Sequence, residues 1–212
     1  MRNVTVIPNG CDTAPLPALD AKPLTTTLHL AAVSRLAPNK RVDHAIELVR
    51  TLLDRGVETQ LTVVGGGEEA ENLKQLAAAR GLAQRVVFTG SLPEAGKNEV
   101  LRQAHFLIHA SVREGWGLNV LEANAMGTPA VVYPVAGLVD STLDRQTGWI
   151  ARQESPAALA DVIVEVLKSP MAYDACRIRA WERSKEFRWQ VILPKACVWL
   201  EEQAMRKPVA LR

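Results

Sequence analysis

The chain has 212 residues, of which 48% are hydrophobic and 23% charged, and its formal net charge is +2. This is an ordinary globular composition with enough apolar residues for one sizeable core, so it excludes a disordered chain. The near-neutral charge gives no reason to expect nucleic acid as a partner.

Cys11, Cys176 and Cys197 are odd in number and widely spaced, which argues against a disulfide framework and favours reduced thiols in a cytoplasmic protein. No apolar run reaches the roughly 18 residues that a membrane span needs.

Residues 1–26 differ from the rest of the chain. The stretch NVTVIPNG predicts a short N-terminal strand and a turn, and the following DTAPLPALDAKP, rich in proline and alanine, is typical of a linker. Because a lone strand and a linker come first, we expect another domain to precede this chain in the intact protein.

From residue 27 onward, short β-rich runs alternate with helical patterns. Val42, Ile46 and Val49 recur at helical spacing, and Ser155 with Pro156 provides an N-cap and a first helical position. The predicted strands span 27–33, 59–67, 85–90, 105–111, 129–135 and 147–152. The predicted helices span 42–56, 68–81, 94–104, 117–125 and 155–169, and helical material follows from about 171 to 206.

This alternation, with few hairpin signals, predicts right-handed βαβ units. The expected fold class is therefore α/β, a Rossmann-like, doubly wound parallel sheet with helices on both faces. Sheets of this kind bind ligands at the carboxyl ends of their strands, so functional side chains should lie at strand-to-helix junctions.

Two junctions carry residues that suit an anion. In SRLAPNKR, Arg35 and Lys40 flank a strand end and a helix start, where cations and helix amides favour a phosphate or diphosphate. Taken alone, that stretch is explained more simply as a surface loop with a salt bridge. In VVGGGEE, Gly65 and its two neighbours permit a tight turn and close approach of a ligand. The pattern is neither GxGxxG nor a P-loop, and glycine turns are common at such places.

A third junction, EGWGLNVLEANAMGTP, places two glutamates around an apolar turn. Glu114 should lie in the loop after a strand, and Glu122 more than one turn inside the helix that follows. Eight helical residues span about 12 Å, roughly the reach from a ribose to a sugar across two phosphates. Free N–H groups at the helix start suit phosphate, and carboxylates accept from vicinal hydroxyls. The alternative, a loop-capping Glu114 and a Glu122 on an exposed helix face, stays open at this point.

The segment EGWGLNVLEANAMGTPAVV resembles the E-x7-E segment of retaining GT-B glycosyltransferases of family four, the glycosyl transferases group 1, where it reads like EGFGL…LEAMACGTPVV. Further segments are similar to that family in the same order: VIPNG, SRLAPNKRVD, VVGGGEE, VVFTGSLP, TGWI and FRWQ. The resemblance covers nearly the whole chain. It implies the C-terminal, donor-binding half of a GT-B fold, with residues 27–187 as the nucleotide-sugar-binding domain and 188–212 as a C-terminal return helix and tail.

The resemblance also implies a role for each matching residue. Arg35 and Lys40 would hold the donor diphosphate and stabilise the leaving group, and Glu114 would contact the donor sugar. Glu122 would accept from the ribose hydroxyls. Three more contacts are implied: phosphates at the main-chain N–H groups of Gly117, Leu118 and Asn119, close approach of the donor at Gly65, and a base pocket near Leu92.

The chain departs from the family pattern at three places. Arg41 replaces the glycine that usually follows the lysine, and Trp116 replaces a phenylalanine. The stretch VAGLVDSTLDRQTGWI lacks the common acidic residue after its turn and has Asp140 nearby instead. No metal or other cofactor is implied, because His105 and His109 on a strand do not form a compact chelate.

The family pairs two Rossmann-like halves, and this sequence matches only the second. We therefore expect the missing N-terminal Rossmann-like domain as a partner, together with a nucleotide-sugar donor such as a UDP- or GDP-hexose. The fragment alone should bind donor weakly and not turn over. Two other interpretations remain: an epimerase-like GT-B domain and a non-catalytic nucleotide-binding module.

Residues 177–212 hold nine Lys or Arg against four Glu. A solvated helical surface explains this surplus. It also permits peripheral contact with anionic lipid, so the expected location is cytoplasmic, with contact to the inner face of a membrane as a further expectation.

Overall fold

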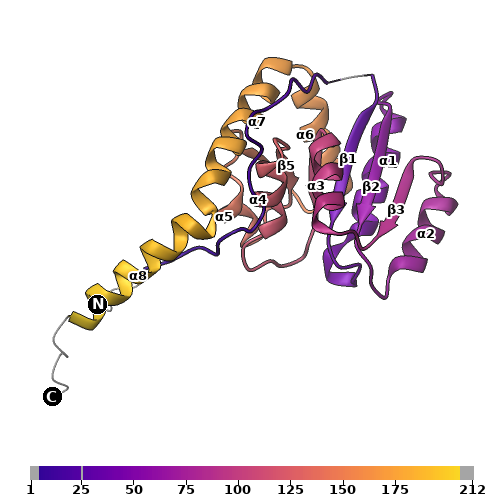
Figure 1. Ribbon diagram of the computed structural model, residues 1–212. Helices are drawn as coiled ribbons and strands as arrows, with labels where there is room; N and C mark the ends of the chain where they lie inside the picture. Colours follow the sequence, from indigo (N-terminus) through magenta and orange to yellow (C-terminus); the bar gives the residue numbers. More distant parts are fainter. Residues whose placement is uncertain (1–4, 25, 206–212) are drawn as a thin grey trace.

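The computed structural model describes residues 5–24 and 26–205, and these contain one parallel sheet of six strands (Figure 1). The strand order is β3-β2-β1-β4-β5-β6, with every neighbouring pair parallel. This order confirms the doubly wound, Rossmann-like sheet predicted from the alternation. The strands are β1 Leu28–Val33, β2 Thr59–Val64, β3 Val86–Gly90, β4 Phe106–His109, β5 Ala130–Val132 and β6 Gly148–Ile150.

Helices cover both faces of the sheet. On one face α1 packs against α2 and α6, and on the other α3 packs against α4, which also contacts α5. Helix α7 packs against α4, α6 and the edge strand β6. The helices are α1 Val42–Asp54, α2 Ala70–Ala79, α3 Glu94–Gln103, α4 Leu118–Ala125, α5 Leu138–Ser141, α6 Pro156–Leu167, α7 Pro170–Ser184 and α8 Trp189–Met205, with 3-10 turns η1 Pro38–Lys40 and η2 Lys185–Phe187.

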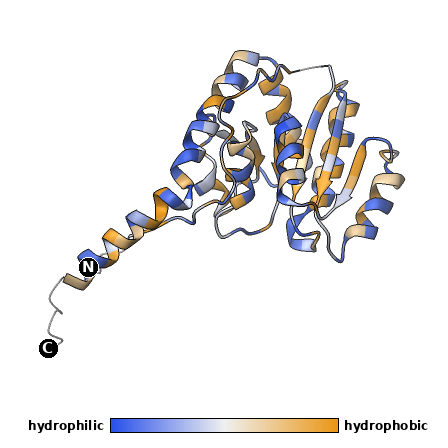
Figure 2. Cartoon of the chain, in the orientation of Figure 1, coloured by the Kyte–Doolittle hydropathy of each residue, from blue (hydrophilic) through white to orange (hydrophobic). Residues whose placement is uncertain are grey.

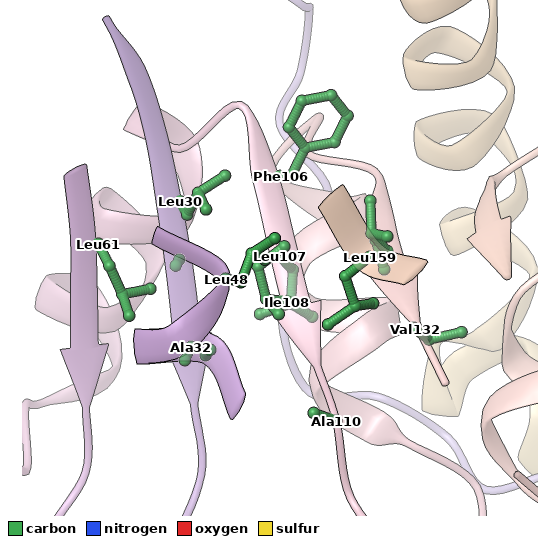
Figure 3. Close-up of a cluster of buried hydrophobic side chains, with 14 of the residues drawn as sticks. Leu30, Ala32, Leu48, Leu61, Phe106, Leu107, Ile108, Ala110, Val132 and Leu159 are labelled. Carbon is green, nitrogen blue, oxygen red and sulfur yellow. The ribbon is translucent and has the colours of Figure 1, made fainter. Parts of the chain in front are cut away.

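The core forms where the sheet meets its covering helices. All four residues of the central strand β4 are buried, as expected for a parallel strand covered on both faces. Leu48 of α1 and Leu159 of α6 lie among the strand side chains (Figure 3). Figure 2 shows mainly hydrophobic strands and helices of alternating character. Each fully buried leucine contributes about 1.5–3 kcal/mol of transfer free energy, so the core fixes the positions of the strand ends.

The segment predicted as a linker is fastened to the domain at the amino ends of the strands. Lys22 Nζ donates to the carbonyl oxygens of Ala104 (2.9 Å) and Gly127 (3.2 Å) and to Oγ1 of Thr128 (2.6 Å). Trp181 Nε1 donates to the carbonyl oxygen of Leu16, 2.9 Å away. These bonds hold residues 16–22 against the body of the domain.

Some predicted elements differ from the observed ones. Part of the N-terminal strand lies outside the described residues. The rest of that prediction is wrong, because residues 5–10 have no regular structure and Cys11 forms only an isolated bridge to Arg188. The reason is that this segment has no neighbouring strand and runs beside α8 instead. The short helix α5 was not predicted.

The C-terminal helical region is broken in two. Arg188 is extended, with φ −69° and ψ 145°, so the chain turns after η2 and restarts as α8. Figure 1 shows α8 projecting from the body of the domain, with residues near the N-terminus beside it. Within the described ranges, no helix is both long and apolar enough to cross a membrane.

Candidate functional site

The junctions after β1 and β4 lie side by side, because these two strands are neighbours in the sheet. The chain leaves β1 toward β2 on one side and leaves β4 toward β5 on the other. Such a reversal is the switch point at which α/β sheets bind ligands. The backbone N–H of Val112 donates to the carbonyl oxygen of Asn39 over 2.9 Å and joins the two loops.

Glu114 is the centre of a polar network at this switch point. Lys40 Nζ forms an ion pair with Glu114 Oε1, and Ser111 Oγ donates to the same oxygen over 2.9 Å. Partial burial raises the pKa of Glu114, but the hydrogen bonds from Lys40 and Ser111 outweigh it and lower the pKa below its usual value. Glu114 is therefore an ionised acceptor at neutral pH. No described residue forms a hydrogen bond or ion pair with its second oxygen.

His109, the last residue of β4, contacts both Glu114 and Ser111 of this network. Its Nε2 lies 3.4 Å from Glu114 Oε1, its Nδ1 lies 3.3 Å from Ser111 Oγ, and its side chain is 5% exposed. Burial lowers the pKa of His109, so the ring is neutral near pH 7. The sequence prediction missed both Ser111 and His109. The signal was present, since polar residues end an otherwise apolar strand just before Glu114.

Arg35 is not part of the Glu114 network. Its side chain is exposed and forms no hydrogen bond or ion pair with any residue that the structure describes. The structure thus brings Lys40 and Glu114 into contact and leaves the guanidinium of Arg35 free for a ligand at the same strand end.

Arg41 adopts the conformation that the family's glycine would favour. Its backbone is left-handed, with φ 48° and ψ 46°, at the point where η1 ends and α1 begins. Its Nη1 lies 2.5 Å from Oε2 of Glu154, in the loop that precedes α6. Arg41 in place of the family's glycine therefore keeps the left-handed turn before α1, and its side chain links this turn to the loop before α6.

The glycine turn after β2 supports the loop that carries Arg35. Gly65 and Gly67 have φ values of +136° and +156°, and a Cβ at either position would overlap the carbonyl oxygen of Ser34 or Leu36, respectively. The backbone N–H of Leu36 donates to the carbonyl oxygen of Gly66 over 2.9 Å. Gly65 thus has a structural reason to be glycine, and its contact with a donor stays a prediction.

Helix α4 presents its N-terminus to the switch point. Gly117 caps it with a left-handed φ of 79°. No backbone hydrogen bond in the described part of the chain uses the N–H of Leu118 or Asn119, so both amides are available to an anion. The side-chain amide of Asn119 donates to the carbonyl oxygen of Val33 over 2.7 Å and fixes α4 against the end of β1.

Glu122 lies one turn further along α4 and pairs with a residue of another helix, not with the Glu114 network. Its Oε1 is 2.8 Å from Nζ of Lys97 in α3, and both side chains are about one-fifth exposed, at 21% and 19%. The sequence prediction missed Lys97, which nothing in its local pattern distinguishes from other helical lysines. Leu92, the expected base-pocket residue, is half-buried just before α3 begins and packs near Gly96.

The two remaining departures from the family pattern have structural roles. Trp116 packs against Phe187 with ring centroids 5.8 Å apart. Asp140 Oδ2 accepts from the backbone N–H of Gly137 over 3.3 Å and caps α5.

The chain is similar to known proteins over most of its length. The family model for glycosyl transferases group 1 matches residues 21–183. A glycogen synthase from Mycobacterium tuberculosis is 31% identical over 193 residues, which are 91% of this chain and 47% of that protein. A GDP-mannose-dependent mannosyltransferase from Mycolicibacterium smegmatis is 31% identical over 149 residues, 66% of this chain and 39% of that protein.

Solved structures show the same fold. Staphylococcus aureus TarM, in a complex that includes UDP, has a TM-score of 0.78 at 20% identity and covers 95% of this chain, which matches 39% of TarM. Anabaena HepE, solved with UDP and glucose, has a TM-score of 0.74 at 19% identity over 84% of this chain and 49% of HepE. The chain spans less than half the length of these curated relatives. The matched family model, the related sequences and the shared fold together show that this chain belongs to the glycosyl transferases group 1 family.

Proposed function

We propose that this chain is the donor-binding half of a retaining glycosyltransferase that transfers a hexose from a UDP- or GDP-sugar to an acceptor. The observation that carries the proposal is the contact between Lys40 and Glu114. These residues are 74 positions apart, come from separate motifs, and meet at the switch point of the sheet. Relatives whose names mention GDP-mannose and structures solved with UDP support the class of donor.

Each part of the donor has a matching group in the site. Lys40 has three N–H donors and uses one on Glu114. The others, with Arg35 and the free amides of Leu118 and Asn119, would neutralise a diphosphate and its charge as the sugar leaves. The free oxygen of Glu114 would accept from a sugar hydroxyl, and Glu122 from the ribose. These cations and amides would supply the stabilisation without a metal ion or other cofactor.

The second half of the enzyme would come from elsewhere in the intact protein. The chain covers 47% of the glycogen synthase that it matches. An apolar groove of about 490 Å³ lies between residues 5–8 and α8, and Val6 and Val198 beside it are 81% and 53% exposed. We propose that the missing N-terminal Rossmann-like domain covers this surface. Val198→Asp should then leave nucleotide binding by this chain unchanged and reduce transfer by the intact enzyme.

Membrane contact has less support than donor binding. Arg177, Arg179 and Arg183 of the basic C-terminal region donate to the carbonyl oxygens of Asp20, Gln146 and Ser141, so their charges face the domain. A cytoplasmic location with peripheral contact to an anionic membrane remains a proposal. Cosedimentation with phosphatidylserine vesicles at low salt tests it, and a chain that stays in the supernatant contradicts it.

Calorimetric titration with UDP, GDP, UDP-glucose and GDP-mannose tests the proposed function. The unaltered chain should bind at least one of them, and Lys40→Ala or Glu122→Ala should weaken binding by about tenfold or more. Lys74→Ala is the matched control, because Lys74 is half-exposed on α2 and far from the site in sequence.

No binding by the unaltered chain would overturn the proposal. Binding of a protein partner independent of nucleotide would favour the non-catalytic module. Interconversion of sugar nucleotides would favour the epimerase-like alternative. We expect no sugar transfer by this polypeptide alone, and measurable transfer would contradict the proposed division into halves.

A further inference from the structure

The ion pair between Lys97 and Glu122 differs from the other lysine–glutamate pairs on the helices. Its atoms are 2.8 Å apart, and its two side chains are only about one-fifth exposed. The pairs of Lys74 with Glu71 on α2 and of Lys185 with Glu182, where η2 follows α7, each join residues three positions apart, and their side chains are 41% to 71% exposed. Exposed pairs of that kind contribute little to stability. The Lys97 pair instead joins α3 to α4 at a half-buried place beside the switch point.

The pair leaves both partners with unused hydrogen-bonding capacity. Lys97 forms an ion pair with Oε1 of Glu122, and no described residue forms a hydrogen bond or ion pair with Oε2. An ammonium has three N–H donors, and the described contacts of Lys97 use one. An acceptor and two donors are thus held side by side. A ribose 2′,3′-diol, whose hydroxyls both donate and accept, matches such a pair.

The surroundings of the pair suit the rest of a nucleoside. Leu92 lies at the start of α3 and packs near Gly96, the residue before Lys97. Thr13 Oγ1 donates to Oε1 of Glu94 over 3.3 Å, which holds the N-terminal segment against the same turn of α3. An apolar side chain therefore packs on the turn of α3 that carries Lys97, where a base could contact it.

We propose that Lys97 is a positioning residue of the nucleoside subsite, which holds Glu122 in one orientation and offers its remaining donors to the ribose. The proposal rests on the proposed function and goes further, because it divides the site in two. Lys40 and Arg35 serve the diphosphate, whereas Lys97 and Glu122 serve the nucleoside. Lys97 has no described hydrogen bond or ion pair with Lys40 or Glu114. Substitutions in the diphosphate part and in the nucleoside part of the site should therefore change ligand binding separately.

Calorimetry with two ligands tests this division. Lys97→Met should raise the Kd for UDP by about tenfold or more and change the Kd for inorganic diphosphate by less than about twofold. Lys40→Ala should weaken both ligands. Lys97→Arg, which keeps the charge and the donors, should bind UDP within about threefold of the unaltered chain. Lys74→Met is the matched control and should change neither Kd.

A second measurement uses the unaltered sequence and does not depend on how a variant folds. The protein is produced with ¹³C,¹⁵N-labelled lysine, which keeps all three N–H donors of each ammonium, and the Lys97 and Lys40 side-chain resonances are assigned with Lys97→Arg and Lys40→Arg. UDP should shift both resonances, whereas inorganic diphosphate should shift that of Lys40 and leave that of Lys97 in place.

The outcomes separate this inference from the proposed function. UDP binding that Lys97→Met leaves unchanged would overturn the inference and leave the proposed function standing. An equal loss of UDP and diphosphate binding in Lys97→Met would also overturn it, since that result indicates general damage. Absence of UDP and GDP binding by the unaltered chain would overturn the proposed function and this inference with it.

Discussion

Asn119, at the start of α4, donates its side-chain amide to the carbonyl oxygen of Val33, the last residue of β1, over 2.7 Å. The bond joins the end of β1 to the start of α4, where the proposed donor would lie. It gives the carbonyl of Val33 a partner and sets the direction in which the N-terminus of α4 points. The geometry of the phosphate site therefore depends on a side chain that was expected to contribute only its backbone N–H.

Removal of this bond should be costly. Asn119→Ala leaves the carbonyl of Val33 without its partner, so the free energy of unfolding should fall by about 1–2 kcal/mol. Asn72→Ala on α2 is the control, because its amide lies 3.4 Å from Glu69 at an exposed site, and it should change stability by less than about 0.5 kcal/mol. Urea unfolding measures both, and equal effects of the two variants would contradict the structural role of Asn119.

Gly65 should be far less tolerant of a side chain than Gly56. Both have positive φ, but a Cβ at Gly65 would overlap the carbonyl oxygen of Ser34, whereas a Cβ at Gly56 would meet nothing within 4 Å. Gly56→Ala should cost about 1–2 kcal/mol of backbone strain, and Gly65→Ala at least about 2 kcal/mol more. Thermal unfolding compares them, and similar melting temperatures would show that the loop near Arg35 does not depend on this contact.

Arg41 offers a test of the backbone at the start of α1. Its left-handed conformation favours glycine, and its exposed pair with Glu154 contributes at most about 1 kcal/mol. Arg41→Gly loses the pair and relieves the strain, whereas Arg41→Ala loses the pair and keeps the strain. The glycine variant should therefore be more stable than the alanine variant by about 1 kcal/mol. Chemical denaturation measures the free energies of unfolding of the two variants. A more stable alanine variant would contradict the left-handed backbone at this position.

The stability of the domain should fall in mild acid. Burial lowers the pKa of His105 from 6.5 to about 4, so below about pH 6.5 the unfolded chain binds a proton that the folded chain does not. The contribution is fully present above the unfolded pKa of 6.5 and is lost as the pH falls toward 4. At about pH 5 the loss from this one histidine should be about 2 kcal/mol. His109, whose pKa burial also lowers, acts in the same direction.

His105→Gln provides the matching variant for this pH dependence. In the folded domain, His105 Nδ1 accepts from the backbone N–H of His29 over 3.0 Å, and its Nε2 lies 3.2 Å from the carbonyl oxygen of Pro23. Glutamine retains an acceptor and a donor but does not titrate. The difference in unfolding free energy between about pH 7 and about pH 5 should therefore shrink in the variant. A stability that is constant over this range in the unaltered chain would contradict the burial of a neutral His105.

The sequence was sufficient to predict a doubly wound parallel sheet, because short apolar strand runs alternate with longer segments that carry a helical repeat. The ends of the strands were predicted too long, since apolar residues such as Ala110 and Val135 continue into buried loops. Helix α5 has four residues and no helical repeat, so its pattern predicts nothing. The break before α8, at the extended residue Arg188, has no helical repeat to mark it, but the resemblance of FRWQ to the start of the family's last helix placed a boundary at residue 188.

The candidate site was predictable in part, for a similar reason. Residues of the E-x7-E segment and Lys40 could be found because motifs are local in sequence. Lys97 could not, since it acts through the packing of α3 on α4. Ser111 and His109 were missed although they stand just before Glu114 in the sequence. The contact of Gly65 with the carbonyl oxygen of Ser34 also needed the structure, and its contact with a donor stays a prediction.

The most direct test of the central claim is a crystal structure of this chain with bound UDP. The account predicts the diphosphate at the N-terminus of α4, within hydrogen-bonding distance of Lys40, and the ribose hydroxyls at Glu122. A nucleotide bound away from both residues, for instance in the apolar groove beside α8, would contradict it.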